Sequence, residues 1–371
     1  MRVLFTCGGT AGHINPALAV ASKLKSMDRG CEALFVGAEN RMEMDLVPRA
    51  GYEIKPITIT NLSRSFSVSG ISHNIRTAKN VIASTREAKE IIRSFQPDVV
   101  VGTGGYVCYP VLTAASALHV PAVIHESNAM PGLTTRLLEK KADKILVGFE
   151  HCKDAYRNAE KVIVTGTPVR DAFESISTEE ARRKIGISEK PLVLSVWGSL
   201  GAEHMNKTVL QMIPYMKEKR FSLIHVTGSR YYKEFMSELE KLQPDYASCD
   251  VTIMEYLHNM PETMKAADLI LCRAGASTLA ELTFIGKPAI LIPSPNVTAN
   301  HQEKNARMLE SSGAAKVLLE GEFDAETLYH TILESVNDRE MLSRMGEKAL
   351  VLSQADAAEQ ICHVICSLVK G

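Results

Sequence analysis

The chain has 371 residues, of which 45% are hydrophobic and 23% charged, and its formal net charge is −1. This length suggests two domains of ordinary size, and the near-neutral charge argues against a nucleic-acid partner. The sequence has eight cysteines, no Cys-x-x-Cys pair and no recognisable signal peptide, which predicts free thiols in a reducing cytoplasm. It has no apolar run of about 18 residues that would span a membrane.

Strand signals alternate with helical patterns along the chain, which predicts βαβ units and parallel sheets. Both halves open with a buried strand, a glycine turn and a helix. We therefore predict an α/β protein of two Rossmann-like domains facing each other across a cleft. The expected domains are residues 1–165 and 166–345. The segment from residue 338 to the C-terminus is expected to be helical throughout. Its last part, residues 346–371, is expected to be a helix that crosses back to the first domain. The expected strands are 2–6, 33–37, 54–59, 98–102, 122–126, 144–147 and 162–165, then 192–197, 222–227, 251–255, 269–272, 289–293 and 315–318.

The stretch Cys-Arg-Ala-Gly-Ala-Ser-Thr-Leu-Ala-Glu at residues 272–281 follows an apolar strand and opens a helix. Gly275 lets the backbone come close to a ligand, and the helix start at Ser277 and Thr278 favours an anion such as phosphate. Glu281 lies one turn further on, where a carboxylate can bind both hydroxyls of a ribose. The alternative is a capped helix with a surface glutamate. Three more glycine turns follow strands at residues 8–13, 102–106 and 198–202, and four such turns indicate two phosphate-binding halves.

The first of these turns, Gly-Gly-Thr-Ala-Gly-His, differs in spacing from the dinucleotide-binding fingerprint. His13 opens the helix that follows, where an imidazole can act as a general base. The alternative is a histidine that caps or packs locally. Gly104, Gly105 and Tyr106 form a turn of the same kind, which we expect to face the same cleft.

Polar residues at other strand ends are further candidates. The residues His-Glu-Ser-Asn at 125–128 end an apolar strand, where buried polar groups are costly without a purpose. Asn128 could bind a sugar hydroxyl, although Ser and Asn also suit a plain turn. Arg170, beside the predicted hinge, could clamp a diphosphate or form an ordinary salt bridge. Three more residues are candidates for binding a ligand: Ser199 for a nucleotide phosphate, the backbone of Leu257 for a base, and Gln302 for sugar hydroxyls. The alternative is core packing for Leu257 and a capped surface helix for Gln302.

The sequence contains no Asp-x-Asp motif, so a diphosphate clamped by a metal would lack its usual carboxylate pair. We therefore expect no metal and no cofactor, with helix N-termini, backbone amides and Arg170 in their place. Residues 61–71 combine apolar side chains with an arginine, and the next helix carries Arg76, Lys79, Arg86 and Arg93. This surface could rest on anionic lipid headgroups; a mobile loop and a solvated helix face are the alternative.

Taken in order, these motifs resemble the MurG family, the N-acetylglucosaminyltransferases that convert lipid I to lipid II in bacterial peptidoglycan synthesis. The resemblance covers nearly the whole chain and includes Arg-Met-Glu-Met-Asp-Leu-Val-Pro at residues 41–48. It implies a GT-B fold and an inverting, metal-independent transfer of N-acetylglucosamine from UDP-N-acetylglucosamine to the 4-hydroxyl of the N-acetylmuramoyl unit of lipid I. It also implies a peripheral enzyme on the cytoplasmic side of the cell membrane.

The same resemblance assigns roles to individual residues, with His13 as the catalytic base. The donor would be bound by Thr10, Ala11, Gly12, Asn128, Arg170, Ser199, Leu257, Ala276, Ser277, Thr278, Leu279, Ala280, Glu281 and Gln302. The acceptor would be bound by Gly9, Gly104, Gly105, Tyr106 and Glu126. The chain departs from the family pattern at Ala11, Ser127, Leu200 and His301, and it keeps every proposed catalytic group.

Three other functions are compatible with these motifs. One is a UDP-N-acetylglucosamine epimerase on a similar two-domain fold, and another is a nicotinamide dehydrogenase, which the spacing of the first turn disfavours. The third is a non-catalytic nucleotide-sugar-binding protein. His13 and the two N-terminal glycine turns argue against that third function, because a sensor needs no acceptor pocket.

Overall fold

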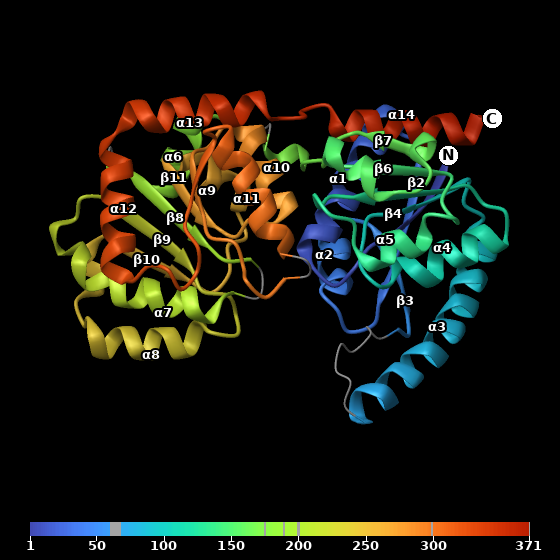
Figure 1. Cartoon of the computed structure of the whole chain (residues 1–371), viewed down its shortest axis with the longest axis horizontal. Helices are drawn as coiled ribbons and strands as arrows, with labels where there is room; N and C mark the ends of the chain where they lie inside the picture. Colours follow the sequence, from blue (N-terminus) through green and yellow to red (C-terminus); the bar gives the residue numbers. More distant parts are fainter. Residues whose placement is uncertain (60–67, 174–175, 188–189, 199–200, 298–299, 371) are drawn as a thin grey trace. The chain divides into compact units, whose positions relative to one another are not determined.

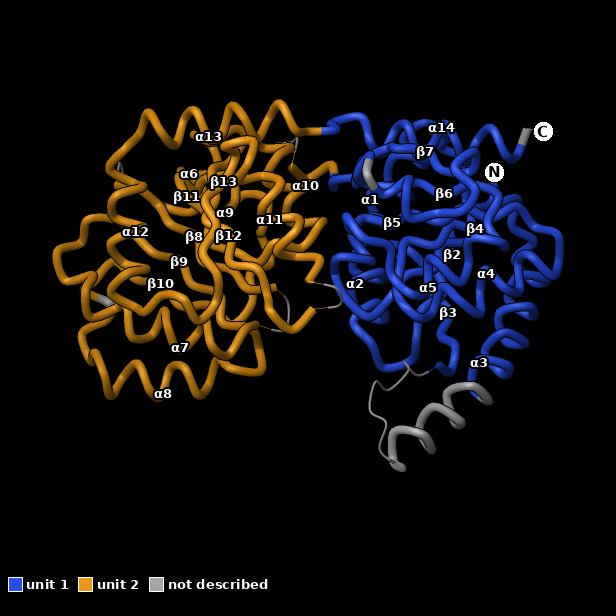
Figure 2. Tube along the Cα trace, viewed as in Figure 1, with its two compact units in different colours: residues 1–170, 354–371 blue, residues 171–353 orange. Residues whose placement is uncertain are grey.

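The computed structural model of the chain describes residues 1–59, 68–173, 176–187, 190–198, 201–297 and 300–370. The chain forms two compact units, unit 1 with residues 1–170 and 354–371 and unit 2 with residues 171–353 (Figure 2). The sequence predicts these boundaries at residues 165 and 345, and the structure divides the chain after residues 170 and 353. Unit 1 therefore contains both the first strand and the last helix.

Unit 1 is built on a seven-stranded parallel sheet in the order β3-β2-β1-β4-β5-β6-β7. The strand order reverses between β1 and β4, which pair directly, with Thr6 opposite Gly102. The turns that follow these two strands therefore start side by side at the carboxyl edge of the sheet, where α/β proteins bind ligands. The strands are β1 (Arg2–Thr6), β2 (Glu32–Ala38), β3 (Glu53–Ile57), β4 (Val99–Gly102), β5 (Ala122–Glu126), β6 (Lys144–Val147) and β7 (Val162–Val164).

Helices cover both faces of this sheet (Figure 1). Successive residues of β1 alternate between two cores, since Leu4 belongs to one apolar cluster and Val3 and Phe5 to the other. The last helix closes the second cluster, because Ile361 and Cys362 are fully buried within it. The helices of unit 1 are α1 (Ala11–Met27), α2 (Glu43–Arg49), α3 (Val68–Phe95), α4 (Cys108–Ala117), α5 (Leu133–Leu138) and α14 (Ala357–Lys370).

Unit 2 repeats the plan with a six-stranded parallel sheet in the order β10-β9-β8-β11-β12-β13. Its order reverses between β8 and β11, so the turns after these two strands are the equivalent ligand-binding position. The strands are β8 (Leu192–Val196), β9 (Ser222–Val226), β10 (Val251–Met254), β11 (Leu269–Cys272), β12 (Ala289–Leu291) and β13 (Ala315–Val317). The helices are α6 (Thr178–Ile185), α7 (Glu203–Met212), α8 (Tyr232–Leu242), α9 (Met260–Ala266), α10 (Ala276–Ile285), α11 (His301–Ser311), α12 (Ala325–Asn337) and α13 (Arg339–Val351).

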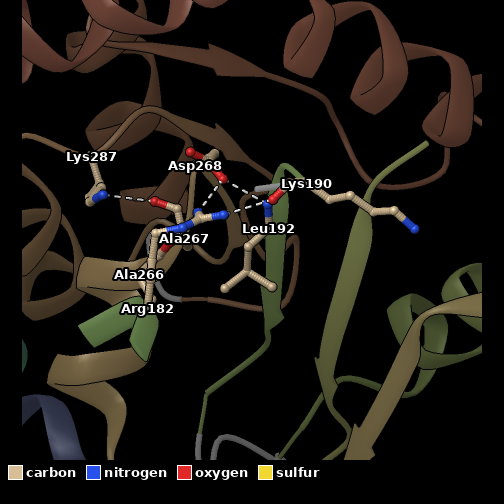
Figure 3. Close-up of polar contacts among 7 residues, drawn as sticks. All are labelled: Arg182, Lys190, Leu192, Ala266, Ala267, Asp268 and Lys287. Atoms are coloured by element: carbon tan, nitrogen blue, oxygen red, sulfur yellow. Dashed lines mark hydrogen bonds and ion pairs between the residues drawn. The ribbon is translucent and has the colours of Figure 1, made fainter. Parts of the chain in front are cut away.

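A polar cluster ties the amino ends of β8 and β11 together (Figure 3). One carboxylate oxygen of Asp268 accepts hydrogen bonds from Arg182 at 2.8 Å and from the Leu192 amide at 2.7 Å. Lys287 donates to the Ala267 carbonyl at 2.8 Å, and burial lowers its pKa to about 8. This cluster lies at the end of the strands opposite the glycine turns, so we assign it a structural role.

The thirteen predicted strands are confirmed in the described part of the chain, with ends that differ by a few residues at most. The prediction of an unbroken helix from residue 338 is wrong, because the chain leaves helical structure between α13 and α14. α13 belongs to unit 2 and α14 to unit 1, so the break is where the chain passes from one unit to the other. Gln354, in this break, packs against Gly166.

Candidate active site

His13 lies in the first turn of α1, directly after the glycine turn that follows β1. Its Nδ1 is 2.9 Å from the Gly8 carbonyl oxygen and 3.4 Å from the Thr10 hydroxyl. Because a carbonyl only accepts, the contact with Gly8 places a proton on Nδ1, and in the neutral ring Nε2 is the nitrogen that accepts a proton. The side chain is partly exposed. This is the tautomer that a general base acting through Nε2 requires.

The turn after β4 packs directly against this histidine. A Cβ atom on Gly104 would lie 2.5 Å from His13 Cδ2, and Gly104 has a φ of +118° that side chains rarely allow. The Thr103 hydroxyl donates to the His13 carbonyl at 2.7 Å. A Cβ atom on Gly105 would lie 2.3 Å from the Gly8 carbonyl oxygen. The two predicted N-terminal turns thus meet around one imidazole.

Glu43 is a residue of this site that the sequence analysis did not single out. Its side chain is fully buried, and its two oxygens accept hydrogen bonds from the Gly9 amide at 3.1 Å and the Ala38 amide at 3.0 Å. The Gly9 amide is therefore bonded to Glu43 and not presented to a phosphate. The available signal was the stretch 41–48, which carried the family resemblance without an assigned role.

Glu126 organises the loop between β5 and α5. The side chain is buried, and one oxygen accepts from the Asn128 amide nitrogens, backbone at 3.0 Å and side chain at 2.9 Å. The other oxygen accepts from the Gly132 amide at 2.9 Å and the Thr135 hydroxyl at 2.8 Å. These four bonds give Glu126 a structural role and fix the orientation of Asn128.

His125 is also buried, and burial lowers its pKa. Its Nε2 lies 2.8 Å from the Gly166 carbonyl oxygen, and its Nδ1 lies 3.3 Å from the Ser127 hydroxyl. Its two ring nitrogens are engaged within unit 1, so we assign His125 to the support of the β5 strand end.

In unit 2, the helix α10 starts directly after the turn that follows β11. Gly275 is its N-cap, with φ of −71° and no side-chain cap bond. The neighbour nearest to a Cβ on Gly275 would be the Thr278 hydroxyl at 4.0 Å, so there is room for a group to approach this backbone. The fully buried Asn305 donates to the Ala274 carbonyl at 3.1 Å and holds the turn in place. Glu281, one turn further on, is 8% exposed.

A cavity of about 570 Å³ in unit 2 lies beside the turns after β8 and β11. Arg273, the residue after β11, pairs with Glu320 and lies 5.7 Å from the centre of the Trp197 ring. Gln302 also lines the cavity, and its side-chain oxygen accepts from the Ser294 amide at 2.8 Å. The predicted sugar-binding glutamine thus borders a hollow at the switch point of unit 2.

The other predicted site residues divide between the two units. Ser199 and Leu200 lie outside the described residues, as do residues 61–67 of the predicted membrane surface. Leu257 is buried in the segment after β10, and Arg170 is a partly exposed residue at the end of unit 1. Tyr106 lies in the turn after β4, against Gly9. Thr10, Ala11 and Gly12 form the start of α1, and Ala276, Ser277, Thr278, Leu279 and Ala280 the first turns of α10.

All eight cysteines are free thiols. Across the residues that the structure describes, no three His, Cys, Asp or Glu side chains converge as a metal-binding group. Within the same residues, none of the helices combines the length and the apolar character needed to cross a bilayer.

Comparison with known proteins assigns both halves of the chain. The N-terminal domain model of glycosyltransferase family 28 matches residues 3–147, and the C-terminal domain model matches residues 192–361. A curated relative from Acetivibrio thermocellus, named UDP-N-acetylglucosamine–N-acetylmuramyl-(pentapeptide) pyrophosphoryl-undecaprenol N-acetylglucosamine transferase, is 41% identical over 100% of this chain and 99% of its own length. The enzyme of that name from Bacillus cytotoxicus is 40% identical, with 100% of both chains covered.

Among solved structures, MurG from Acinetobacter baumannii matches with a TM-score of 0.72 and 28% identity, covering 99% of each chain. A UDP-GlcNAc 2-epimerase from Neisseria meningitidis, at 16% identity and a TM-score of 0.69, shares the fold. The two sheets and the two family models together define a glycosyltransferase of the GT-B class, as predicted. By its full-length likeness to the curated transferases, the chain belongs to the MurG family within glycosyltransferase family 28.

Proposed function

We propose that the chain transfers N-acetylglucosamine from UDP-N-acetylglucosamine to the 4-hydroxyl of the N-acetylmuramoyl unit of undecaprenyl-pyrophosphoryl-MurNAc-pentapeptide, lipid I. The product is lipid II, the precursor of peptidoglycan. The printed names of the full-length relatives support this donor and acceptor. The observation that carries the proposal is the His13 imidazole, held by the Gly8 carbonyl at 2.9 Å with Nε2 as its proton acceptor.

The chemistry follows from the two linkages. An α-linked donor that gives a β-linked product requires one in-line displacement with inversion. The acceptor oxygen bonds to the anomeric carbon, the bond from that carbon to UDP breaks, and UDP leaves with the electron pair. His13 Nε2 takes the proton of the attacking hydroxyl, a contribution of about a hundredfold to ten-thousandfold for a well-placed base.

We assign the donor to unit 2 and the start of α10 to its diphosphate. The room at Gly275 supports this assignment, because the positive end of a helix dipole stabilises an anion only at close approach. Glu281 then binds the ribose, Leu257 lies at the base, Ser199 at the phosphate, and Gln302 and Asn128 at the sugar. Thr10 to Gly12 and Arg170 complete the set of donor residues, and Gly104, Gly105 and Tyr106 are assigned to the acceptor side. Gly9 and Glu126, whose amide and carboxylate are bonded within unit 1, are assigned to the support of the turns on that side.

We also propose that transfer proceeds without a metal ion. The start of α10 and Arg170 offer positive charge to the departing diphosphate, which is the role a divalent cation plays in other transferases. Turnover is therefore expected to be unchanged by a chelator such as EDTA, measured as formation of lipid II.

For localisation we propose a peripheral position on the cytoplasmic face of the cell membrane, with an anionic surface as partner. Three apolar side chains support this, since Ile82 of α3 and Leu133 and Leu137 of α5 are 75%, 62% and 53% exposed. Arg86 lies one turn after Ile82, and its side chain is 85% exposed. Apolar side chains next to basic ones suit a surface of anionic lipid.

The experiment supplies radiolabelled UDP-N-acetylglucosamine with and without a lipid I analogue. We expect label in the lipid product only when the acceptor is present, and His13→Ala should lower turnover by about a hundredfold or more while UDP affinity stays unchanged. Consumption of the donor without acceptor would point to an epimerase instead. Unchanged turnover in His13→Ala would remove His13 from the mechanism.

A further inference from the structure

We infer that Glu43 is a positioning residue for the general base, and that it acts by holding the glycine turn that fixes the tautomer of His13. This inference rests on the proposed role of His13. Glu43 is the first residue of α2, 30 residues along the chain from His13, and it makes no contact with a substrate in our assignment.

Two glycines, Gly8 and Gly37, form a socket for the Glu43 side chain, meaning a space in which it is in close contact with both of them. Gly8 and Gly37, at the ends of β1 and β2, leave the space that the side chain fills. A Cβ on Gly8 would lie 2.3 Å from Glu43 Oε1, and a Cβ on Gly37 would lie 2.6 Å from Glu43 Cγ. Neither position has room for a side chain while Glu43 is in place.

The two carboxylate oxygens accept hydrogen bonds from two different strand ends. Oε2 accepts from the Gly9 amide and Oε1 accepts from the Ala38 amide. Both partners are donors, so the side chain must present two acceptors. A glutamine of the same shape has one acceptor and one donor, and in either orientation its NH₂ group would face a backbone N–H.

The connection from Glu43 to His13 has one intermediate. Glu43 fixes the Gly8–Gly9 turn through its hydrogen bond with the Gly9 amide. The Gly8 carbonyl of the same turn accepts a hydrogen bond from His13 Nδ1 at 2.9 Å. Val107 also packs against Gly8, because a Cβ there would lie 3.0 Å from its Cγ1. If the turn moves, the carbonyl that sets the tautomer moves with it, and Nε2 no longer faces the attacking hydroxyl.

A role in folding alone makes a different prediction. A residue that only stabilises the unit would lower the fraction of folded enzyme and leave the turnover of the folded molecules unchanged. A positioning residue lowers kcat in the folded enzyme, and it does so only while the base that it positions is present.

The experiment is a double-mutant cycle with Glu43→Gln and His13→Ala, measured as lipid II formation well below the melting temperature of each variant. The matched control is Asp45→Asn, on the same helix, where the carboxylate is exposed and pairs with Arg49 at 3.0 Å. UDP affinity, measured by calorimetry, reports in every variant on the assigned donor contacts, which include the start of α10, Glu281 and Leu257 of unit 2.

We expect Glu43→Gln to lower kcat by about tenfold or more, with UDP affinity unchanged and the control at the turnover of the parent enzyme. In the His13→Ala background the same substitution should change the residual rate by less than about twofold. An equal loss in both backgrounds, or no loss in the parent enzyme, would overturn the inference. Full activity of His13→Ala would instead overturn the proposed base, whatever Glu43→Gln does.

Should Glu43→Gln not accumulate as folded protein, Gly37→Ala carries the same test. It keeps both carboxylate oxygens but displaces the Glu43 side chain from its socket. The expected pattern is again a fall in kcat that disappears in the His13→Ala background, and a loss that persists there undiminished would contradict the inference.

Discussion

The two units share one architecture, but the glycines after their central strands differ in how closely other atoms surround them. In unit 1 the glycines of the turn after β4 are packed, since a Cβ on Gly104 or Gly105 would collide with His13 or with the Gly8 carbonyl. In unit 2 Gly201 is packed against the Thr227 carbonyl, but a Cβ on Gly198 would meet nothing within 4 Å, and one on Gly275 would meet only the Thr278 hydroxyl at 4.0 Å. Gly104 and Gly105 thus pack around the His13 turn in unit 1, whereas Gly275 leaves room at a helix start in unit 2.

The buried carboxylates add to this contrast. In unit 1, Glu43 and Glu126 both accept backbone amides of loops at the carboxyl edge of the sheet. Both α1 in unit 1 and α10 in unit 2 begin without a side-chain cap, but at α10 the N-cap residue Gly275 has no neighbour closer than 4.0 Å to a Cβ. Under the proposed function, this difference gives unit 1 fixed side chains around His13 and gives unit 2 an accessible backbone at the start of α10.

The largest effect is expected from filling a packed glycine. Gly104→Ala places a methyl group 2.5 Å from His13 Cδ2 at a φ of +118°, so the turn and the imidazole cannot both keep their positions. Turnover should fall by about a hundredfold or more, with UDP affinity unchanged. Steady-state assay and calorimetry on the same preparation measure both, and near-normal turnover would show that the packing of this turn is not needed for activity.

An effect of intermediate size is expected from a buried histidine in unit 2. Burial lowers the pKa of His225 to about 3, whereas in the unfolded chain it is about 6.5. The unfolded state therefore binds a proton first as the pH falls. The free energy of unfolding of unit 2 should decrease below about pH 6.5, by about 2 kcal/mol between pH 7.5 and pH 5.

Urea denaturation at these two pH values measures this loss. The single tryptophan of the chain, Trp197, is 3% exposed in the core of unit 2 and reports its unfolding. In the parent chain the Ser195 hydroxyl lies 2.9 Å from His225 Nδ1. The variant His225→Asn can keep this hydrogen bond but cannot be protonated, so it should reduce the pH dependence of the free energy of unfolding. An unchanged pH dependence in this variant would assign the loss to other groups. His125 should act in the same direction in unit 1, because burial lowers its pKa too.

The smallest effect is expected at an open glycine. Gly275→Ala has an allowed φ of −71° and no close neighbour, so the free energy of unfolding should change by less than about 0.5 kcal/mol. The added methyl group occupies the space where we place the diphosphate, so UDP affinity should fall by about tenfold. Calorimetry with UDP measures this, and unchanged affinity would mean that no ligand group approaches the backbone there.

Sequence patterns predicted the strands and their turns well, because apolar runs and glycine positions are local signals. They predicted that the turn at Gly104 faces the same cleft as His13, because ligands bind beyond the carboxyl ends of the strands in such sheets, but not that the two residues touch. They did not find Glu43, since its bonds to Gly9 and Ala38 depend on how α2 packs against two strands. They also could not separate a ligand-binding glutamate from Glu126, whose four donors are recognisable only in three dimensions.

The enclosure of unit 2 within the sequence of unit 1 has a consequence for biosynthesis. Ile361, Cys362 and Ile365 of α14 are fully buried in the same core as Val3 and Phe5. A ribosome synthesises every residue of unit 2 before it synthesises this helix. Unit 2 can therefore complete its fold before unit 1, although unit 1 begins first in the chain. Until α14 emerges, the nascent first unit exposes an uncovered apolar face and is the stage most open to chaperones or to aggregation.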